Sequence, residues 1–451
     1  MSLLQDTLDW LEDKNPGQDE FLQAAREVCE YIVPIVNASP QYKTHNVLQR
    51  ILSADKIYEF SVVWENDKGE PEVNTGWRVQ HNNALGPYKG GTRFHPTLNV
   101  SILKFLALEQ SFKNSLTQLT LGSGKGGADF NPKGRSENEI RRFCNAYIKK
   151  LHQHIGPYTD VPAGDINVGD KELGFMFGEY LRLSKTYDGA ISGKPIGVGG
   201  SRLRTQATGF GVIYFLEEML KADKEDLQGK KVLVSGAGNV ALHAALIAVQ
   251  KGAIVLSLSN SRGLLHADGG LRESHINWLL QNGKQHSNAL QSLANLKARD
   301  SASVLEYKEN AAPWNIKADI AIPCATQNEV DADTAAQIIK NITFGLIEGA
   351  NMPCTQDASE ALLNSPLKYA PGKAANAGGV IVSTFEMQQN AAMRYESEED
   401  LNARLNQKMI DIHKACADES NAQGNTDINY VQGANIAGFR RLADAMVSGG
   451  F

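Results

Sequence analysis

KVLVSGAGNVA, residues 231–241, is the most informative segment of this sequence. It starts as a short apolar run, typical of a buried parallel strand, and passes through two glycines into a helical pattern. The spacing Gly236-x-Gly238-x-x-Ala241 matches the dinucleotide fingerprint. There the first glycine makes the turn, the second lets the backbone approach a pyrophosphate, and the small third residue lets the helix pack on the strand. The alternative is a tight strand-to-helix turn in another doubly wound protein.

Three further apolar runs follow, at Ala253–Ser259, Ala318–Pro323 and Phe344–Glu348. Helical patterns lie before or between them, and strands that alternate with helices predict a parallel sheet. Residues 232–250 contain no Asp, Glu, Lys or Arg, which raises the question of a membrane span. The turn-type residues inside that stretch favour a buried strand and its crossover helix, so no membrane partner is predicted.

The N-terminal half has a different pattern. Ile57–Trp64 and Trp77–His81 alternate apolar and polar residues, which predicts two half-buried strands joined as a hairpin. Residues 18–38 read as a helix that is interrupted near Pro34. Residues 189–200 contain five glycines and one proline, which predicts an interdomain hinge.

These patterns predict an α/β protein of two domains. The first is a substrate-binding and oligomerisation domain at residues 1–200, on which a C-terminal helix at 426–451 packs back. The second is a Rossmann-type dinucleotide-binding domain at residues 201–425, with a cleft between the two.

Composition narrows the function classes. The chain has 451 residues and a net charge of −6, which argues against a nucleic-acid partner held by phosphate contacts. Its five cysteines form no CxxC pair, and the N-terminus has no secretory pattern, so a cytoplasmic protein is expected. No HExxH motif or Cys/His cluster is present, so no metal site is predicted.

The cofactor preference is read from the end of the next strand. A carboxylate that binds the ribose of NAD should lie about 20 residues after the glycines. Ser259, Asn260, Ser261 and Arg262 stand there instead. These side chains can donate hydrogen bonds to a 2′-phosphate, and Arg262 adds charge, so NADP is favoured over NAD. The alternative is that Arg262 is solvated and Asn260 only shapes a turn.

Two segments before the predicted hinge place a lysine among glycines: Lys89 in residues 86–96 and Lys125 in residues 121–134. Glycine lets the backbone approach a ligand closely. Lys113 and Gln110 lie one helical turn apart between the two segments. Three lysines that converge would suit a dianionic substrate, whereas the plain alternative is that each is a solvated surface charge.

Asp165 follows Ala-Gly in the loop-like segment DVPAGDINVGD, residues 160–170. An acid in this setting can act as a proton shuttle. It can equally be a turn former, and the sequence leaves both readings open.

Together these motifs resemble the hexameric glutamate dehydrogenases of the small NADP-linked type, in the Glu/Leu/Phe/Val dehydrogenase family. The resemblance covers nearly the whole chain. It rests on KGGTRFHP (89–96), EQSFKN (109–114), GSGKGGADFNPKGR (122–135), DVPAGDINVG (160–169), ATGFG (207–211), SGAGNVA (235–241), PCATQNE (323–329), EGANMP (348–353) and ANAGGVIVSTFEMQQ (375–389).

The resemblance implies reversible reductive amination of 2-oxoglutarate with ammonium to L-glutamate by a homohexamer, with NADP as cofactor and NAD as a weaker or dual one. It implies that Lys125 is the catalytic lysine and Asp165 the proton-transfer acid. It places Lys89 and Ser383 on the γ-carboxylate, and Lys113, Gln110 and Gly164 at the α-carboxylate end. The implied cofactor contacts are Thr208, Gly236, Gly238, Asn239, Val240, Ser261, Arg262, Asn351 and Asn376.

Three residues depart from the family pattern. Ser123 replaces a glycine, Thr92 replaces an aliphatic residue, and Asn260 replaces an aspartate common in NADP-linked members. Two alternatives to the implied activity stay open. A leucine, phenylalanine or valine dehydrogenase should lack both Lys89 and Ser383, and a catalytically dead NADP-binding protein should lack Lys125 or Asp165.

Overall fold

The computed structural model describes residues 2–297 and 304–450. The chain forms two compact units. The first comprises Met1–Arg204, Val380–Leu401 and Asn435–Phe451, and the second comprises Thr205–Gly379 and Asn402–Ala434. No helix among the described residues is both long and apolar enough to cross a membrane.

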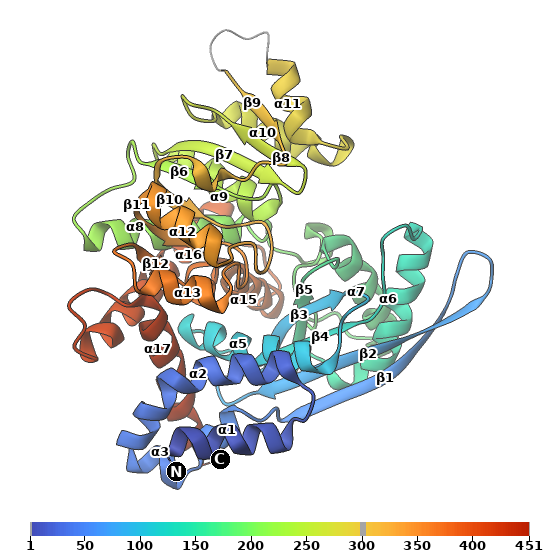
Figure 1. Ribbon diagram of the computed structural model, residues 1–451. Coiled ribbons are helices and arrows are strands. Elements are labelled where there is room, and N and C mark those ends of the chain that lie inside the picture. The colour runs from blue at the N-terminus through green and yellow to red at the C-terminus, as the bar shows by residue number, and fades with distance from the viewer. Residues whose placement is uncertain (1, 298–303, 451) are drawn as a thin grey trace. The chain divides into compact units, whose positions relative to one another are not determined.

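The first unit is built on a five-stranded sheet of order β1-β2-β4-β3-β5 (Figure 1). Its strands are β1 (Lys56–Glu65), β2 (Pro71–Asn82), β3 (Tyr88–Phe94), β4 (Ser123–Ala128) and β5 (Asp160–Gly164). β1 pairs antiparallel with β2, as the predicted hairpin requires, and β2 also pairs antiparallel with β4. β3 pairs parallel with β4 and with β5. The α-helices before the crossing at Arg204 are α1 (Leu3–Lys14), α2 (Asp19–Ala38), α3 (Pro40–Thr44), α4 (Val47–Ile51), α5 (Val100–Leu116), α6 (Glu137–Leu151) and α7 (Asp170–Ser184).

Helices cover both faces of this sheet. Phe94, Phe143 and Phe177 belong to one apolar core that joins the sheet to α6 and α7. Trp77 and Leu103 belong to a second core, which joins the sheet to α5. The strands that carry the lysine–glycine motifs are therefore enclosed, and every residue of β3 and β4 is buried.

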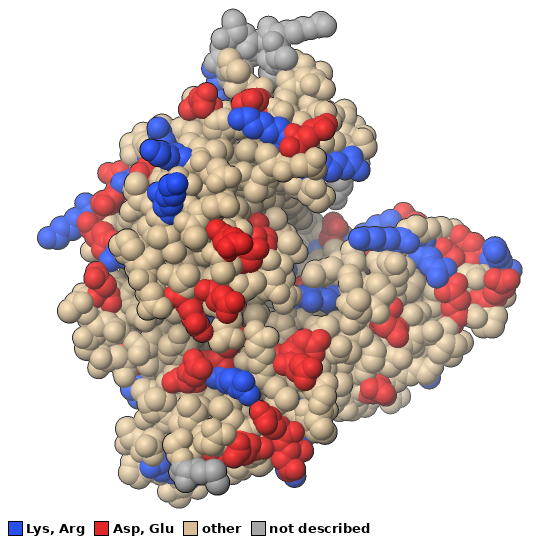
Figure 2. Space-filling model, viewed as in Figure 1, with Lys and Arg blue, Asp and Glu red and all other residues tan. Residues whose placement is uncertain are grey.

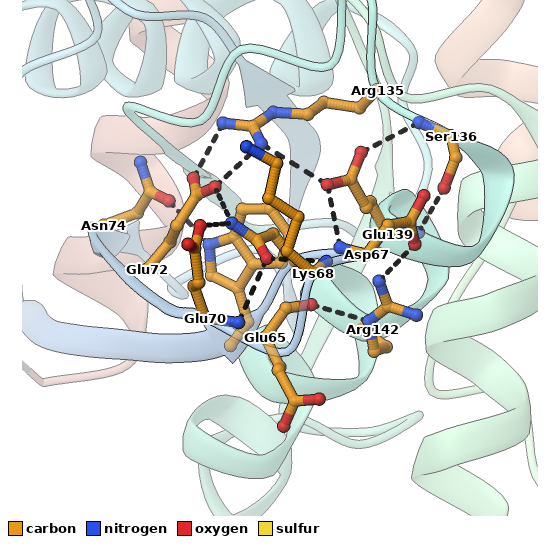
Figure 3. A network of polar contacts seen from close by, with 12 residues as sticks. Glu65, Asp67, Lys68, Glu70, Glu72, Asn74, Arg135, Ser136, Glu139 and Arg142 are labelled. Carbon is orange, nitrogen blue, oxygen red and sulfur yellow. Dashed lines mark hydrogen bonds and ion pairs between the residues drawn. The ribbon is translucent and has the colours of Figure 1, made fainter.

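The turn of hairpin β1–β2 is fastened to the start of α6 by a network of charged side chains (Figure 3). Arg135 makes two parallel contacts with Glu72, at 2.8 and 2.7 Å, and also pairs with Glu139. Glu139 in turn completes a capping box with Ser136 at the N-terminus of α6. Paired Arg–carboxylate contacts define direction as well as distance, so this network holds the hairpin turn against the start of α6. On the face drawn in Figure 2, acidic and basic side chains are mixed over this hairpin.

The second unit contains a seven-stranded sheet of order β12-β11-β10-β6-β7-β8-β9. Its strands are β6 (Lys231–Val234), β7 (Ile254–Asn260), β8 (Gly263–His266), β9 (Glu306–Glu309), β10 (Ala318–Ile322), β11 (Ile342–Ile347) and β12 (Lys368–Ala370). The strands from β12 to β7 pair parallel, which confirms the predicted parallel sheet, and β8 and β9 extend it antiparallel. Its α-helices are α8 (Ala207–Ala222), α9 (Asn239–Gln250), α10 (Glu273–Asn282), α11 (Ala289–Lys297), α12 (Ala332–Asn341), α13 (Gln356–Leu363) and α14 (Gly372–Ala375).

Three further helices occur where the chain passes between the units: α15 (Gly378–Ala391), α16 (Glu398–Ala422) and α17 (Tyr430–Ser448). The expected second domain ran without a break over residues 201–425, whereas residues 380–401 cluster with the first unit. Residues 380–401 belong with the first unit because buried hydrogen bonds join α15 to the glycine-rich segment at residues 189–200. Arg441 of α17 donates to the carbonyls of Ser115 and Leu119, which ties the chain's last helix to the end of α5.

Two local expectations need correction. Pro34 does not interrupt a helix, because α2 runs unbroken from Asp19 to Ala38 with Pro34 inside it. Burial of Ile32, Val33 and Ile35 around the proline outweighs the lost backbone hydrogen bond. Residues 189–200 are also not a free hinge, because Lys194 is fully buried and bonded to Glu386 and Asn390 of α15.

Candidate functional site

The residues expected to carry the chemistry meet where β3, β4 and β5 lie side by side in the first unit. The Lys125 Nζ atom lies 3.0 Å from the Asp165 Oδ2 atom. The Arg93 Nε atom donates to the same oxygen, also at 3.0 Å. Their side chains are at most 12% exposed. Asp165 is therefore part of a buried charged cluster and does more than shape a turn.

Burial and charge act on this cluster in opposite directions. Burial lowers the pKa of Lys125, and Arg93 lowers it further, while Asp165 raises it; the net shift is downward. Burial would raise the pKa of Asp165, but Lys125 and Arg93 outweigh it, so that pKa lies below its usual range. Asp165 is therefore held ionised, beside a lysine that loses its proton more readily than usual.

Gly91 is what allows the lysine and the aspartate to come this close. A Cβ atom at position 91 would lie 2.8 Å from Asp165 Cβ and 3.2 Å from Lys125 Nζ. Gly91 has no positive φ, so the requirement at this position is for space and not for an unusual backbone conformation. The glycines beside Lys89 thus serve contact between protein groups.

Lys89 itself is a buried cation, 1% exposed. Burial lowers its pKa well below the usual value, and the positive charges of Arg204 and Arg78 lower it further. Arg78 is paired with a carboxylate, because it forms a fully buried ion pair with Asp160. Ser383 of α15 is also buried, and its Oγ atom lies 2.6 Å from the Oγ atom of Ser192.

Arg204 is a candidate that the sequence reasoning missed. Its Nε atom is buried and has no hydrogen-bond partner within the described ranges 2–297 and 304–450. The nearby carboxylate of Glu386 is already occupied by Lys194 at 2.8 Å and by the backbone N–H of Gly193. Lys89 and Arg204 therefore leave an excess of buried positive charge that a ligand carboxylate would neutralise. Nothing in the surrounding sequence SRLRTQ distinguishes this arginine.

Helix α5 brings its polar residues to the same strands. Gln110 donates to Asn114 at 2.6 Å, and Asn114 donates to the carbonyl oxygens of Lys89 and Gly122. Lys113 lies on α5 beside Asn114, one turn after Gln110. Asn114, also missed from the sequence, fixes α5 against both lysine-bearing segments.

The departure at Ser123 has a local partner on α5. Its Oγ atom lies 2.5 Å from that of Ser111, and both side chains are buried. Gly164, at the end of β5, packs so tightly that an added Cβ would lie 2.5 Å from the carbonyl oxygen of Val168.

The glycine turn of the second unit has the geometry that the fingerprint predicts. Gly236 has a φ of +87°, and an added Cβ would lie 2.9 Å from the carbonyl oxygen of Cys324. At Gly238 an added Cβ would meet nothing within 4 Å. Gly238 caps α9 without a side-chain hydrogen bond, so the backbone of Asn239 and Val240 begins a helix N-terminus open to an anion.

Other expected cofactor residues surround this turn. Thr208 lies in the first turn of α8, which packs closely on α9: a Cβ on neighbouring Gly209 would lie 2.7 Å from the carbonyl oxygen of Val240. The Oγ atom of Ser259 accepts the backbone N–H of Gly236 at 3.1 Å. The end of β7 is thereby joined to the glycine turn.

Asn260 shapes the turn between β7 and β8. Its Oδ1 atom accepts the backbone N–H groups of Arg262 and Gly263, and its Nδ2 atom donates to Asn288. Ser261 and Arg262 are exposed at this turn, and Arg262 donates to the carbonyl of Ser287. The two donors expected to read a 2′-phosphate are therefore accessible, while Asn260 is engaged by the protein.

Asn351 and Asn376 are brought together in a separate loop cluster. Asn376 donates to the Oδ1 atom of Asn351 at 3.0 Å and to the carbonyls of Gly349 and Ala350. Its own Oδ1 atom is buried with no partner among the described residues. Glu348, missed from the sequence, accepts from the backbone N–H of Gly372 and so holds the short helix before Asn376. An orphaned buried acceptor fits a ligand that carries an amide N–H.

Comparison with known proteins gives this geometry a context. Residues 199–450 match the family described as Glutamate/Leucine/Phenylalanine/Valine dehydrogenase, and residues 54–182 match its dimerisation domain. The NADP-specific glutamate dehydrogenase of Psychrobacter sp. strain TAD1 is 48% identical over 98% of this chain and 97% of its own. The NAD-specific glutamate dehydrogenase of Bacteroides fragilis is 44% identical over 98% of each chain.

The solved structure of Plasmodium falciparum glutamate dehydrogenase superimposes with a TM-score of 0.96 at 39% identity, covering 99% of this chain and 94% of the other. A match of this extent and quality fixes the fold of both units. The chain belongs to the Glu/Leu/Phe/Val dehydrogenase family, as an oxidoreductase of the glutamate dehydrogenase type.

Proposed function

We propose that this protein catalyses the reversible reductive amination of 2-oxoglutarate, in which ammonium, NADPH and one proton give L-glutamate, NADP⁺ and water. The observation that carries the proposal is the buried excess of positive charge at Lys89 and Arg204. An apolar side chain at that place would leave the buried Lys89 and the buried Nε atom of half-buried Arg204 without a ligand counter-charge, whereas a distal carboxylate neutralises them.

The substrate is held at its two ends. Lys89 and Ser383 bind the γ-carboxylate, and Arg204 adds its unpartnered Nε atom. Lys113 and Gln110 of α5 bind the α-carboxylate end, with a backbone contact from Gly164. Two fixed carboxylates leave the α-carbon one orientation, which is what a stereospecific transfer needs.

The chemistry falls to Lys125 and Asp165. Asp165, held ionised, takes a proton from ammonium, and the ammonia attacks the ketone carbon while Lys125 stabilises the oxygen. Lys125 then donates the proton with which the carbinolamine oxygen leaves as water, and Asp165 exchanges protons with the nitrogen. When bound, the nicotinamide supplies the hydride at the α-carbon.

The cofactor is NADP, with NAD as a weaker alternative. The glycine turn at Gly236 and Gly238, the α9 N-terminus at Asn239 and Val240, and Thr208 would hold the pyrophosphate side. The unpartnered Oδ1 atom of Asn376 would accept the carboxamide N–H at the other end, beside Asn351. Ser261 and Arg262 would bind the 2′-phosphate.

The proposed assembly is a homohexamer in the cytoplasm. Support for an assembly comes from the matched dimerisation domain in residues 54–182. The five cysteines, all free and buried, agree with a reducing compartment.

NADPH oxidation followed at 340 nm tests the function. We expect rapid oxidation with 2-oxoglutarate and ammonium, and slow oxidation with 4-methyl-2-oxopentanoate in its place. NADH should replace NADPH with a kcat/KM lower by about 10-fold or more, the scale of one lost charged contact. Faster turnover of the branched oxo acid would identify a leucine-type enzyme instead.

The γ-carboxylate site has its own test. The double variant Lys89→Leu with Ser383→Val should lower kcat/KM for 2-oxoglutarate by about 1,000-fold, the cost of losing a charge-assisted contact and its neighbour. It should also raise kcat/KM for apolar oxo acids. Lys150→Leu, at an exposed lysine of α6, serves as the control. Undiminished selectivity for 2-oxoglutarate in the double variant contradicts the assignment of this site.

A further inference from the structure

Three charged side chains meet in the catalytic cluster, and one of them has no part in the chemistry described so far. Lys125 Nζ and Arg93 Nε both lie 3.0 Å from the same oxygen of Asp165, Oδ2. Arg93 comes from β3, Lys125 from β4, and Asp165 follows β5 directly. Arg93 is therefore placed to control the other two.

We propose that Arg93 is a positioning residue that supplies Asp165 with a permanent counter-charge, so that Lys125 can give up its proton without leaving a buried carboxylate unpaired. This inference rests on the proposed function, because it assigns a role within that same reaction.

The argument starts from the difference between the two cations. A guanidinium stays protonated throughout the pH range of enzymes, whereas an ammonium buried beside a carboxylate can lose its proton. If Lys125 alone faced Asp165, each loss of the lysine proton would strand an ionised carboxylate in a site at most 12% exposed. With Arg93 on the same oxygen, the carboxylate keeps one cation at every stage of proton transfer.

The charges around Lys125 and Asp165 shift their pKa values in the direction that this role requires. The charged groups that act on the pair come from β2, β3 and β4, namely Arg78, Arg93 and Lys125 itself. Arg78 is already paired with Asp160, so Arg93 is the cation whose counter-charge is Asp165. Its positive charge lowers the pKa of Lys125 and also that of Asp165. Removing that charge should therefore raise both pKa values.

Geometry adds a second effect. Arg93 Nε and Lys125 Nζ both contact Oδ2, so Arg93 holds this oxygen in place when Lys125 moves or loses its proton. A role limited to joining β3 to the end of β5 would make Arg93 matter for stability alone. The pH dependence of turnover separates these two roles.

The experiment compares Arg93→Met and Arg93→Lys with the wild-type enzyme in the reductive amination assay across pH. We expect Arg93→Met to lower kcat by about 100-fold, as for a misplaced acid–base group. The limb of its kcat/KM profile that reports Lys125 should move to higher pH by about one unit, a change that one lost neighbouring charge can cause. NADPH affinity, followed by fluorescence, should stay within a few-fold of wild type.

Arg93→Lys keeps the positive charge and most of the volume. Its limbs should stay near the wild-type pH values while kcat recovers at least 10-fold over Arg93→Met, which restores one charged contact. Arg135→Met, in the ion-pair network beside the hairpin, is the control for losing a paired arginine elsewhere in the same unit (Figure 3). It should leave the profile unchanged.

Two outcomes would overturn the inference. One is Arg93→Met with limbs at the wild-type pH values, whatever its kcat. The other, which covers the case in which Arg93→Met does not fold, is Arg93→Lys with the limb that reports Lys125 displaced upward. Wild-type protein inactive toward 2-oxoglutarate would instead refute the proposed function, so the two failures are distinguishable.

Discussion

The glycines of the two units have different structural roles. In β3 and β4 of the first unit, glycine makes room for other protein groups, as at Gly91, where a Cβ would lie 3.2 Å from Lys125 Nζ. In the turn before α9 of the second unit, Gly238 faces space where a Cβ would meet nothing within 4 Å. The first arrangement packs buried charges together, and the second leaves backbone uncovered.

The difference shows that a glycine motif has to be interpreted from what lies opposite it. A glycine opposite charged side chains supports chemistry and should be sensitive in kcat. A glycine opposite open space supports binding and should be sensitive in the affinity for the ligand. Substitutions in the first region should therefore lower kcat, and substitutions in the second should weaken ligand binding.

Lys125→Ala should give the largest effect, because it removes the buried ammonium group that the glycines of β3 and β4 make room for. We expect kcat to fall by at least about 1,000-fold, within the range for a positioned acid–base group. NADPH should bind as in the wild type, because that contact belongs to the other region. Steady-state assays and NADPH fluorescence measure the two quantities, and turnover within a few-fold of wild type would remove Lys125 from the mechanism.

Gly91→Ala should come next. Its methyl group would press on Asp165 and Lys125 from within 3.2 Å, so the pair must separate. Misplacement on this scale is expected to lower kcat by about 100-fold. The check is kcat beside the thermal midpoint, and a variant with full kcat would mean that the lysine and aspartate tolerate a wider spacing.

Gly238→Ala should affect binding instead. No atom of the described residues lies within 4 Å of the added methyl, so the thermal midpoint should not change. Kd for NADPH should rise about 10-fold, as one close backbone–phosphate contact is lost. Gly236→Ala is the contrasting variant in the same turn. At φ +87° and 2.9 Å from the Cys324 carbonyl oxygen, it should lose about 1–2 kcal/mol of stability. Equal stability losses in both variants would contradict the distinction.

Thr92→Val should give the smallest effect, and one of opposite sign. The Thr92 Oγ1 atom is buried without a hydrogen-bond partner among the described residues, although the strand lies beside the catalytic cluster. Replacing the hydroxyl with a methyl group of similar size should raise stability by about 1 kcal/mol and leave kcat unchanged. Thermal unfolding measures this, and a lower midpoint would show that the hydroxyl is satisfied.

Prediction from sequence succeeded where the pattern is local. The parallel strands of the second unit are continuous apolar runs next to a glycine turn, and β1 shows the alternation of a half-buried strand. The expectation that Trp77–His81 is half-buried was wrong, because residues 76–82 of β2 are all buried. Prediction did not reach β3 and β4, which were recognised only as segments that place a lysine among glycines, with no strand predicted there. Every residue of these strands is buried, so they show no alternation to detect.

The site residues divide in the same way. Lys89, Lys125 and Asp165 stand in glycine-rich segments that mark them, and Arg93 lies in the same segment as Lys89 but was not singled out. Arg204 carries no such mark. Ser383 lies far along the chain from Ser192, and only the return of α15 to the first unit brings their hydroxyls within 2.6 Å. No short-range pattern encodes that meeting.

By itself, the sequence determined the class of fold and the dinucleotide turn, because each depends on residues close together in the chain, and its glycine-rich segments marked Lys125 and Asp165 as candidates. The tertiary structure alone decided which charges share an oxygen, that the buried Nε atom of Arg204 meets no hydrogen-bond partner among the described residues, and that the glycine-rich segment at 189–200 is fastened through Lys194 to Glu386. The physical reason is burial: a charge acquires its pKa and its partner from groups that folding brings together from distant parts of the chain.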